Sequence, residues 1–212
     1  MTTRPGFPIW TNESSTNPRD GGLLRGLPDL LESQIVIALL ATCLLLLPMT
    51  TDLSALVFSL RSGDPDERQA AAEKLSQLGP AAQPAAVALV EACERDDEAR
   101  ESAVAALEEL GPPPATDVMK LASLLQHPAL DVAYWAATLL GRLEVQAAPA
   151  ADDLIRALRS HAELAVRQRA AWALGKIGPA AIAAQEALRA AAAGSDPRLA
   201  SLAREAIGHL QR

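Results

Sequence analysis

A segment of fourteen residues recurs five times in this chain, and the repetition constrains the fold more than any other feature. The copies end at Gly79, Gly111, Glu144, Gly178 and Gln211, so consecutive ends are 32, 33, 34 and 33 residues apart. Such a period is typical of proteins built from stacked helical units, in which each unit contacts only its neighbours. The repetition therefore predicts a solenoid rather than a globular fold.

Each copy has the apolar spacing of a helix with one buried face. Counted back from the closing residue, the first and fourth positions are Leu or Ile in every copy, and the eighth is always alanine. These alanines are Ala71, Ala103, Ala136, Ala170 and Ala203. Offsets of three and four form one stripe on an α-helix, and a small residue at its centre allows a neighbouring backbone to approach closely.

A second helix is predicted between consecutive copies. The five segments are 53–61, 84–94, 117–126, 151–160 and 181–193. Gly-Pro pairs after three of the copies close a helix, and Asp-Pro pairs at 64–65 and 196–197 open the next one. Aromatic residues are only 3% of the chain, which disfavours strands. We therefore predict an all-α fold in which residues 52–212 form a right-handed α-solenoid of about five helix pairs.

Charged residues mark the two ends of the predicted solenoid. Seven residues before the closing position, the last copy has Arg204 where the others are apolar. Five residues before it, the first copy has Lys74. The two positions lie on opposite flanks of the central alanine, as two water-facing ends require. We therefore expect the solenoid to begin near Asp52, with the preceding apolar segment outside its core.

The run "AVRQRAAWALGKIGPAA", residues 165–181, resembles the HEAT repeat, especially the short form known from phycobilin lyases. The resemblance rests on Val166, Arg167, Ala170, Ala171, Leu174, Gly175, Ile177 and Gly178. Arg68 and Arg100 recur at the arginine position, whereas Ala133, Ala200 and Glu144 depart from the pattern. The resemblance covers about residues 52–212 and implies an armadillo/HEAT-like fold, which many unrelated scaffolds and enzymes share.

The first 51 residues differ from the repeats. Residues 1–22 are polar and rich in Pro, Gly, Ser, Thr and Asn, which predicts a disordered tail. Within the apolar segment 23–51, residues 33–51 carry no charge and approach the length of about 20 residues that a membrane span needs. Three interpretations stay open: a membrane anchor through 33–51, a core or interfacial helix, and translation from Met49 rather than Met1. We expect a membrane-anchored protein in the first case and a cytoplasmic one otherwise.

Composition and motifs disfavour several functions. The net charge is −7, and residues 64–111 carry twelve acidic against four basic residues, which disfavours nucleic-acid binding. Residues 142–212 carry ten basic against seven acidic residues, an excess of positive charge too small to indicate nucleic-acid binding. His127 and His161 lie one repeat apart without an accompanying carboxylate pattern, so we expect no metal site. Cys93 takes a core position, and no catalytic motif is visible, so we expect neither catalysis nor a cofactor.

The resemblance to phycobilin lyases offers an alternative. A bilin has two propionates and a long apolar body, so a protein that binds it needs a cleft lined with basic and aromatic side chains. The candidates for such a lining are Arg167, Arg169, Trp135 and Trp172. The small number of aromatic residues in the chain disfavours this function.

Tyr134 and Trp172 are the best candidates for a binding site. They lie ten and six residues before their closing residues, in rows that are mostly polar. The two rows share one face of the helices, with Arg142 and Lys176 further along it. Aromatic residues flanked by charge are typical of interface hot spots. In the other interpretation, Trp172 covers a gap left by small alanines, and Trp135 is expected to pack rather than bind.

The sequence as a whole favours a non-catalytic scaffold that binds another protein through Tyr134, Trp172, Arg142 and Lys176. A lyase-like or accessory protein for a bilin or other tetrapyrrole is the alternative. Nucleic-acid binding is the less favoured third function.

Overall fold

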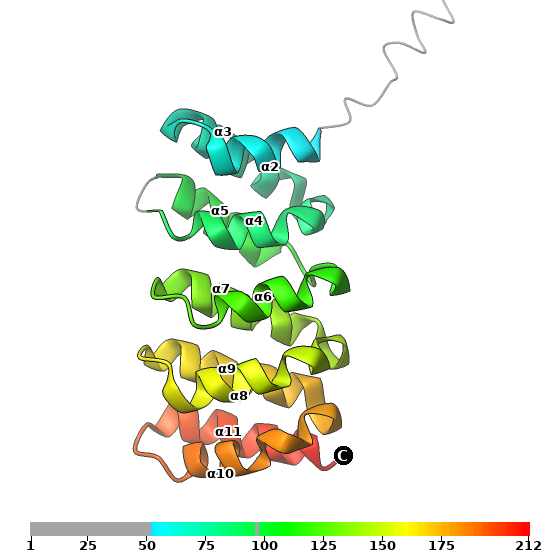
Figure 1. Ribbon diagram of the computed structural model, residues 1–212, viewed down its shortest axis with the longest axis vertical. Coiled ribbons are helices and arrows are strands. Elements are labelled where there is room, and N and C mark those ends of the chain that lie inside the picture. Colours follow the sequence, from blue (N-terminus) through cyan, green and yellow to red (C-terminus); the bar gives the residue numbers. More distant parts are fainter. Residues whose placement is uncertain (1–51, 96–97) are drawn as a thin grey trace, which may run out of the picture. The chain divides into compact units, whose positions relative to one another are not determined.

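The computed structural model describes residues 52–95 and 98–212, which form consecutive pairs of α-helices (Figure 1). The first members, here called linking helices, are α2 (Leu53–Ser62), α4 (Ala86–Ala92), α6 (Val118–Leu124), α8 (Ala151–Ser160) and α10 (Gln185–Ala192). The second members, here called repeat helices, are α3 (Pro65–Leu78), α5 (Glu98–Glu109), α7 (Leu130–Arg142), α9 (Leu164–Ile177) and α11 (Pro197–Leu210). The pairs stack in chain order, which confirms the all-α solenoid.

The linking segments are less regular than predicted. Four of them begin with 3₁₀ turns: η1 (Gly79–Ala85), η2 (Ala115–Asp117), η3 (Glu144–Ala150) and η4 (Gly178–Ala184). The α-helices predicted from residues 84 and 181 therefore start only at Ala86 and Gln185. The helix beginning at Ala86 follows Pro84, which has no backbone N–H to donate. None of these four α-helices has a side-chain N-cap. Each of them instead follows directly on a 3₁₀ turn, which is wound more tightly than an α-helix.

Aspartates start two repeat helices as predicted. The Asp64 carboxylate accepts a hydrogen bond from the Glu67 amide in a reciprocal capping box, with Pro65 at the first helical position. The Asp196 carboxylate accepts from the Leu199 amide at 2.6 Å. These caps satisfy N–H groups that a helix start otherwise leaves without partners.

The predicted inner stripe is the core. The five central alanines are at most 2% exposed. The leucine or isoleucine four residues before each closing position is buried in every pair but the last, where Ile207 is half-buried. Cys93 is 3% exposed, and burial raises the pKa of its thiol to about 12, which fits the predicted core role.

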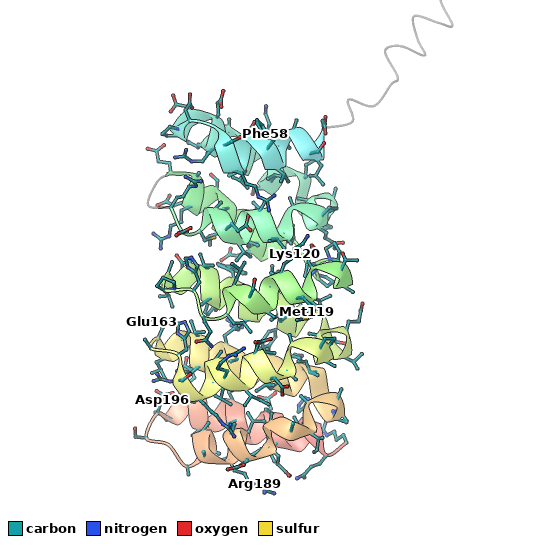
Figure 2. The ribbon with its side chains drawn as sticks, in the orientation of Figure 1. Phe58, Met119, Lys120, Glu163, Arg189 and Asp196 are labelled. Atoms are coloured by element: carbon teal, nitrogen blue, oxygen red, sulfur yellow. The ribbon has the colours of Figure 1, made fainter. Side chains whose placement is uncertain are left out.

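The two charged ends are also as predicted. Lys74 on α3 and Arg204 on α11 are exposed, whereas the residues at the same positions in most other pairs are buried. Phe58 on α2, 71% exposed, is an apolar exception on the first pair (Figure 2).

Glycine closes three repeat helices for a conformational reason. Gly79, Gly111 and Gly178 have φ of 52°, 75° and 69°, a region that other residues rarely adopt. Glu144, which replaces this glycine in the third copy, has φ 50°. The turn is therefore kept by the fold even where the residue does not favour it.

The predictions for residues 1–22 and 23–51, including the anchor at 33–51 and the start at Met49, lie outside the described residues. Within 52–95 and 98–212, none of the helices has the length and hydrophobicity of a membrane span.

Candidate functional site

Spacing between neighbouring repeat helices is uneven. Helices α3 and α5, α7 and α9, and α9 and α11 pack closely, whereas α5 and α7 hardly approach one another. A groove of about 540 Å³ lies at this separation. It is lined by Val104 and Glu108 of α5, by Asp131, Tyr134, Trp135, Thr138 and Arg142 of α7, and by Arg169 and Trp172 of α9. Its volume falls in the range of ligand-binding clefts.

Side-chain contacts hold α5 and α7 together at both ends of the groove. Near the start of the two helices, Arg100 Nε donates to Asp131 Oδ2 at 2.8 Å. Near their ends, the Arg142 guanidinium donates to the carbonyl oxygens of Leu107 and Gly111, at 2.7 and 3.4 Å, and to that of Glu108 at 3.2 Å. Because both ends are tied, we expect the groove to keep its shape without a ligand.

Arg142 is therefore less available than predicted. The sequence places it on the exposed face, but it is half-buried, and three carbonyl groups of the preceding pair occupy its guanidinium. The guanidinium also lies 5.7 Å from the centre of the Trp135 ring, which is 7% exposed and packs as expected. Burial lowers the pKa of Arg142, as does the neighbouring Arg169 charge, while Glu108 raises it. Arg142 thus contributes positive charge and rigidity to the groove.

Arg169, which the sequence suggested only as a bilin contact, lies at the centre of the site. Its guanidinium carbon is 4.5 Å from the centre of the Tyr134 ring and 5.1 Å from that of Trp172. It also donates a hydrogen bond to the Tyr134 hydroxyl. Stacking on two rings fixes the guanidinium, and each such contact contributes about 0.5–1 kcal/mol at a partly exposed site. The available signal was its position three residues before Trp172 on α9.

Trp172 reaches across to the preceding pair and covers Gly141. A Cβ atom built on Gly141 would lie 2.2 Å from Trp172 Cζ3 and 2.7 Å from Cε3, so only glycine admits the ring in this place. Trp172 therefore seals the α7–α9 contact, as one interpretation expected. It remains half-buried and also lines the groove, so packing and binding are not exclusive.

Three cations of this surface lack an acidic partner among the residues that the structure describes. Arg142, Arg169 and Lys176 have no carboxylate oxygen within 4.0 Å, whereas Asp131 is paired with Arg100. Lys176 Nζ lies 5.9 Å from the centre of the Trp172 ring and is exposed. In a chain with 26 acidic and 19 basic residues, such a cluster is a local excess of positive charge, with Glu108 beside it.

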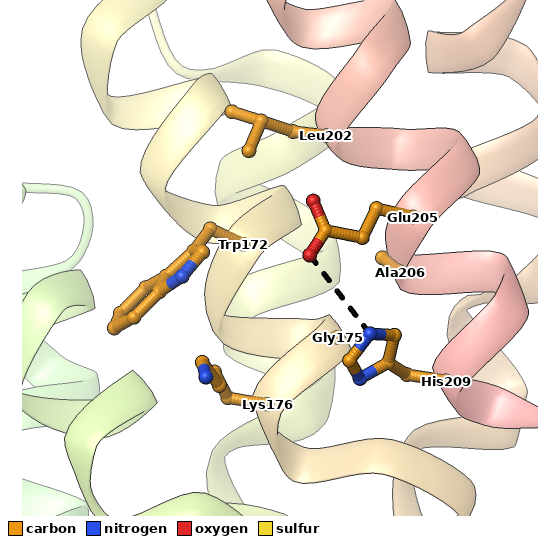
Figure 3. A pocket seen from close by; sticks show the side chains of 7 residues that line it. All are labelled: Trp172, Gly175, Lys176, Leu202, Glu205, Ala206 and His209. Atoms are coloured by element: carbon orange, nitrogen blue, oxygen red, sulfur yellow. Dashed lines mark ion pairs between the residues drawn. The ribbon is translucent and has the colours of Figure 1, made fainter. Parts of the chain in front are cut away.

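Two smaller hollows flank this surface. One of about 200 Å³ lies beside Tyr134, Arg169 and Trp172 and extends to Arg198 and Leu202 of α11. The other, of only about 10 Å³, lies between α9 and α11 next to Gly175, and the Glu205–His209 pair is part of its lining (Figure 3). The second has room for about one water molecule, so it is a packing defect rather than a ligand site.

His127 and His161 organise the turns between helices. Their Nδ1 atoms accept hydrogen bonds from the amides of Ala129 and Glu163, and His161 Nε2 lies 3.4 Å from the His127 carbonyl oxygen. Arg167 donates to the His161 carbonyl at 2.7 Å, so this candidate bilin contact serves the turn and does not line the groove. The described part of the chain contains no group of three His, Cys, Asp or Glu residues placed to hold a metal ion.

Sequence and structure comparisons agree with this architecture. Residues 118–208, from α6 into α11, match the family described as HEAT repeats. The crystal structure of an engineered protein superposes with a TM-score of 0.53 at 22% identity, over 75% of this chain and 79% of that one. At this identity the similarity shows the fold alone. No curated protein matches the sequence. Residues 118–208 are thus similar to HEAT repeats.

Proposed function

We propose that this protein is a non-catalytic HEAT-repeat scaffold that binds another protein at the groove between α5 and α7 and at the adjoining surface of α9. The observation that carries the proposal is that Arg169 and Lys176, which have no carboxylate partner among the described residues, lie against Tyr134 and Trp172 beside a preformed groove of about 540 Å³. Solenoids of this kind commonly bind partners along such extended surfaces. Aromatic and arginine side chains supply most of the energy at protein interfaces.

The mechanism is presentation of a rigid surface. Arg169 is held by two rings, and Arg142 is held by three carbonyl groups, so neither side chain loses much freedom when a partner binds. Fixing side chains before binding reduces the entropic cost of association. The hydroxyl of Thr138 donates to the Tyr134 carbonyl, and the groove lining contains neither His nor Cys, so we assign the groove no catalytic step.

The test compares the full chain with a Tyr134→Ala/Trp172→Ala variant as affinity baits, followed by binding measurements with each purified partner. The matched control is Phe58→Ala, because Phe58 is an exposed aromatic residue on the first pair. Circular dichroism establishes that all baits are folded. Loss of two hot-spot side chains should lower the affinity for a partner bound in the groove by about 30-fold or more. A partner that binds all three proteins equally would refute the assignment of the groove.

A second candidate is a bilin-binding role of the phycobilin-lyase type. The observation in its favour is that Arg169, whose guanidinium is suited to a propionate, shares one groove with Trp135 and Trp172, and that Arg142 adds positive charge there. The test is a titration of the full chain into biliverdin, followed by absorbance in the visible range. A red shift that Arg169→Gln abolishes would support this role, and an unchanged spectrum would reject it.

Nucleic acid fits the groove less well. Glu108 and Asp131 line it beside the arginines, and the whole chain is acidic. A phosphate backbone would meet the Glu108 carboxylate, which has no ion pair among the described residues. Retention on heparin at moderate salt would contradict this reasoning.

A further inference from the structure

Arg169 lies against two aromatic rings and has no carboxylate partner in the described part of the chain. We propose that the groove binds an extended, carboxylate-bearing segment of a partner protein, and that Arg169 holds one of its carboxylates. This inference rests on the proposed function and specifies the chemistry of the partner. It adds that the recognised element is a short linear segment with acidic residues at alternate positions.

The geometry of Arg169 favours a carboxylate. The guanidinium carbon lies 4.5 Å from the centre of the Tyr134 ring and 5.1 Å from that of the Trp172 ring, and the Tyr134 hydroxyl accepts from Nη2. The remaining N–H groups lie along its edge, and a guanidinium edge matches the two oxygens of a carboxylate. The two rings hold that edge in place, so the bond forms with little loss of side-chain freedom.

The shape of the groove favours an extended segment. Its α7 lining runs from Asp131 to Arg142, eleven residues on, which corresponds to about 17 Å of helix. About five residues of extended chain span this length. Alternate side chains of such a chain point in opposite directions, so one set faces Arg169 and the other faces Val104 and Trp135.

The charge distribution then determines the sequence that is recognised. Glu108, on the α5 wall, is exposed and has no ion pair within the part of the chain that the structure describes. Arg169 lies on the opposite, α9 side. The segment therefore places its carboxylates toward α9 and its apolar side chains toward Val104. A uniformly anionic polymer, such as DNA, meets Glu108 along the same path, which disfavours it.

The experiment selects binders to the full chain from a displayed library of random peptides of about twelve residues. We expect the selected peptides to alternate Asp or Glu with apolar residues over about five positions. Binding of a fluorescent copy of one selected peptide is then measured by polarisation. Arg169→Gln should weaken it by about 10- to 100-fold, which is the usual effect of losing a hydrogen-bonded ion pair.

Two further variants separate this effect from misfolding. Arg189→Gln on α10 makes the same charge change at an exposed position in the other helix layer, and should change binding by less than about threefold (Figure 2). Glu108→Gln removes the repelling carboxylate, so it should tighten binding by up to about fivefold. A destabilised protein would not bind more tightly, so this gain is a positive test.

Each remaining outcome overturns the inference. Selected peptides without acidic enrichment, or binding that Arg169→Gln leaves unchanged, would exclude carboxylate recognition while leaving the groove as a docking site. Failure to select any peptide would exclude a linear segment. A DNA oligonucleotide that binds in an Arg169-dependent manner would replace the proposed partner by a nucleic acid. The proposed function is judged separately, by the Tyr134→Ala/Trp172→Ala baits.

Discussion

Three glycines at the same position of consecutive repeat helices provide a test of how the stack is held together. Gly141, Gly175 and Gly208 each lie three residues before the closing residue, on α7, α9 and α11. The next pair places Trp172 against Gly141 and Ala206 against Gly175, whereas Gly208 lies in the last described pair, with nothing within 4 Å of a Cβ atom. Substitution of each by alanine therefore applies the same local change to three different neighbours.

The expected magnitudes follow from the space around each glycine. Alanine in a helix is favoured over glycine by about 0.8–1 kcal/mol. Nothing lies within 4 Å of a Cβ atom at Gly208, so Gly208→Ala should realise this gain and raise Tm by about 2–4 °C. At Gly175, a Cβ atom would lie 3.0 Å from both Ala206 Cα and Cβ, so α9 and α11 must separate. Overpacking of this kind costs about 1–3 kcal/mol, so Gly175→Ala should be destabilising overall.

Gly141→Ala should fall between these two. The Cβ atom would lie 2.2 Å from Trp172 Cζ3, so the ring must leave its place. Because the ring is half-buried, it can turn toward solvent while the backbone stays fixed. The loss of its contacts with Arg169 and α7 should roughly cancel the helix-propensity gain.

Thermal unfolding followed by circular dichroism measures all three changes. The expected order of Tm is Gly208→Ala above the wild type, Gly141→Ala close to it, and Gly175→Ala below it. A Trp135→Phe background makes the emission of Trp172 easier to follow, and only Gly141→Ala should shift it to longer wavelength. Equal effects of Gly175→Ala and Gly208→Ala would refute the reasoning, since they would mean that the neighbouring pair does not limit the space at this position.

Three further expectations follow from single residues. Glu144→Gly should raise Tm by about 1–3 °C because it relieves a positive φ of 50°, whereas Glu144→Ala should not; calorimetry distinguishes the two. The pKa of Asp196 is lowered mainly by a hydrogen bond from the Leu199 amide and, to a smaller extent, by one from the Gln168 side chain. The contribution of Asp196 to stability is therefore present above the unfolded-state pKa and is lost as pH falls through the lower folded-state pKa. Asp196→Ala should therefore lower Tm at neutral pH but not in strong acid, and a Tm–pH profile checks this. The thiol of Cys93, whose pKa is raised to about 12, should resist iodoacetamide at pH 8 until urea unfolds the chain. Peptide mapping detects the labelled cysteine, and rapid labelling of the folded protein would contradict the burial of Cys93.

The helices and their inner stripe could be predicted because they depend on local periodicity. The central alanines and the leucines around them recur with helical spacing, and the structure buries them as expected. The two exceptions in these rows, Leu78 and Ile207, are half-buried and belong to the first and last pairs. Among the described residues, each of those pairs has a neighbouring pair on one side only, so the same sequence position excludes less water there.

The groove could not be predicted in the same way, because it depends on how two pairs sit against one another. Sequence rows identify Tyr134 and Trp172 as neighbours on one face, but they do not show that α5 and α7 stand apart. They also do not show where a long arginine side chain points. Arg142 turns back to the carbonyls of α5, although its row placed it on the exposed face, and Arg169 turns toward two rings.

Gly141 links the packing of the stack to the binding site, and this leads to a last prediction. Gly141 does not line the groove, yet it makes the space in which Trp172 lies, and Trp172 supplies the second ring that contacts Arg169. Gly141→Ala should therefore lower the affinity for an acidic peptide that binds Arg169 by about three- to tenfold, because a guanidinium that contacts one ring is less well fixed. Polarisation with the selected peptide measures the effect, and Gly208→Ala, which leaves Trp172 untouched, is the matched control. Gly141→Ala could shift the Trp172 emission and still leave peptide affinity at the wild-type value. That result would mean that the Trp172 ring is not required to position Arg169, and that its contact with Tyr134 alone accounts for its orientation.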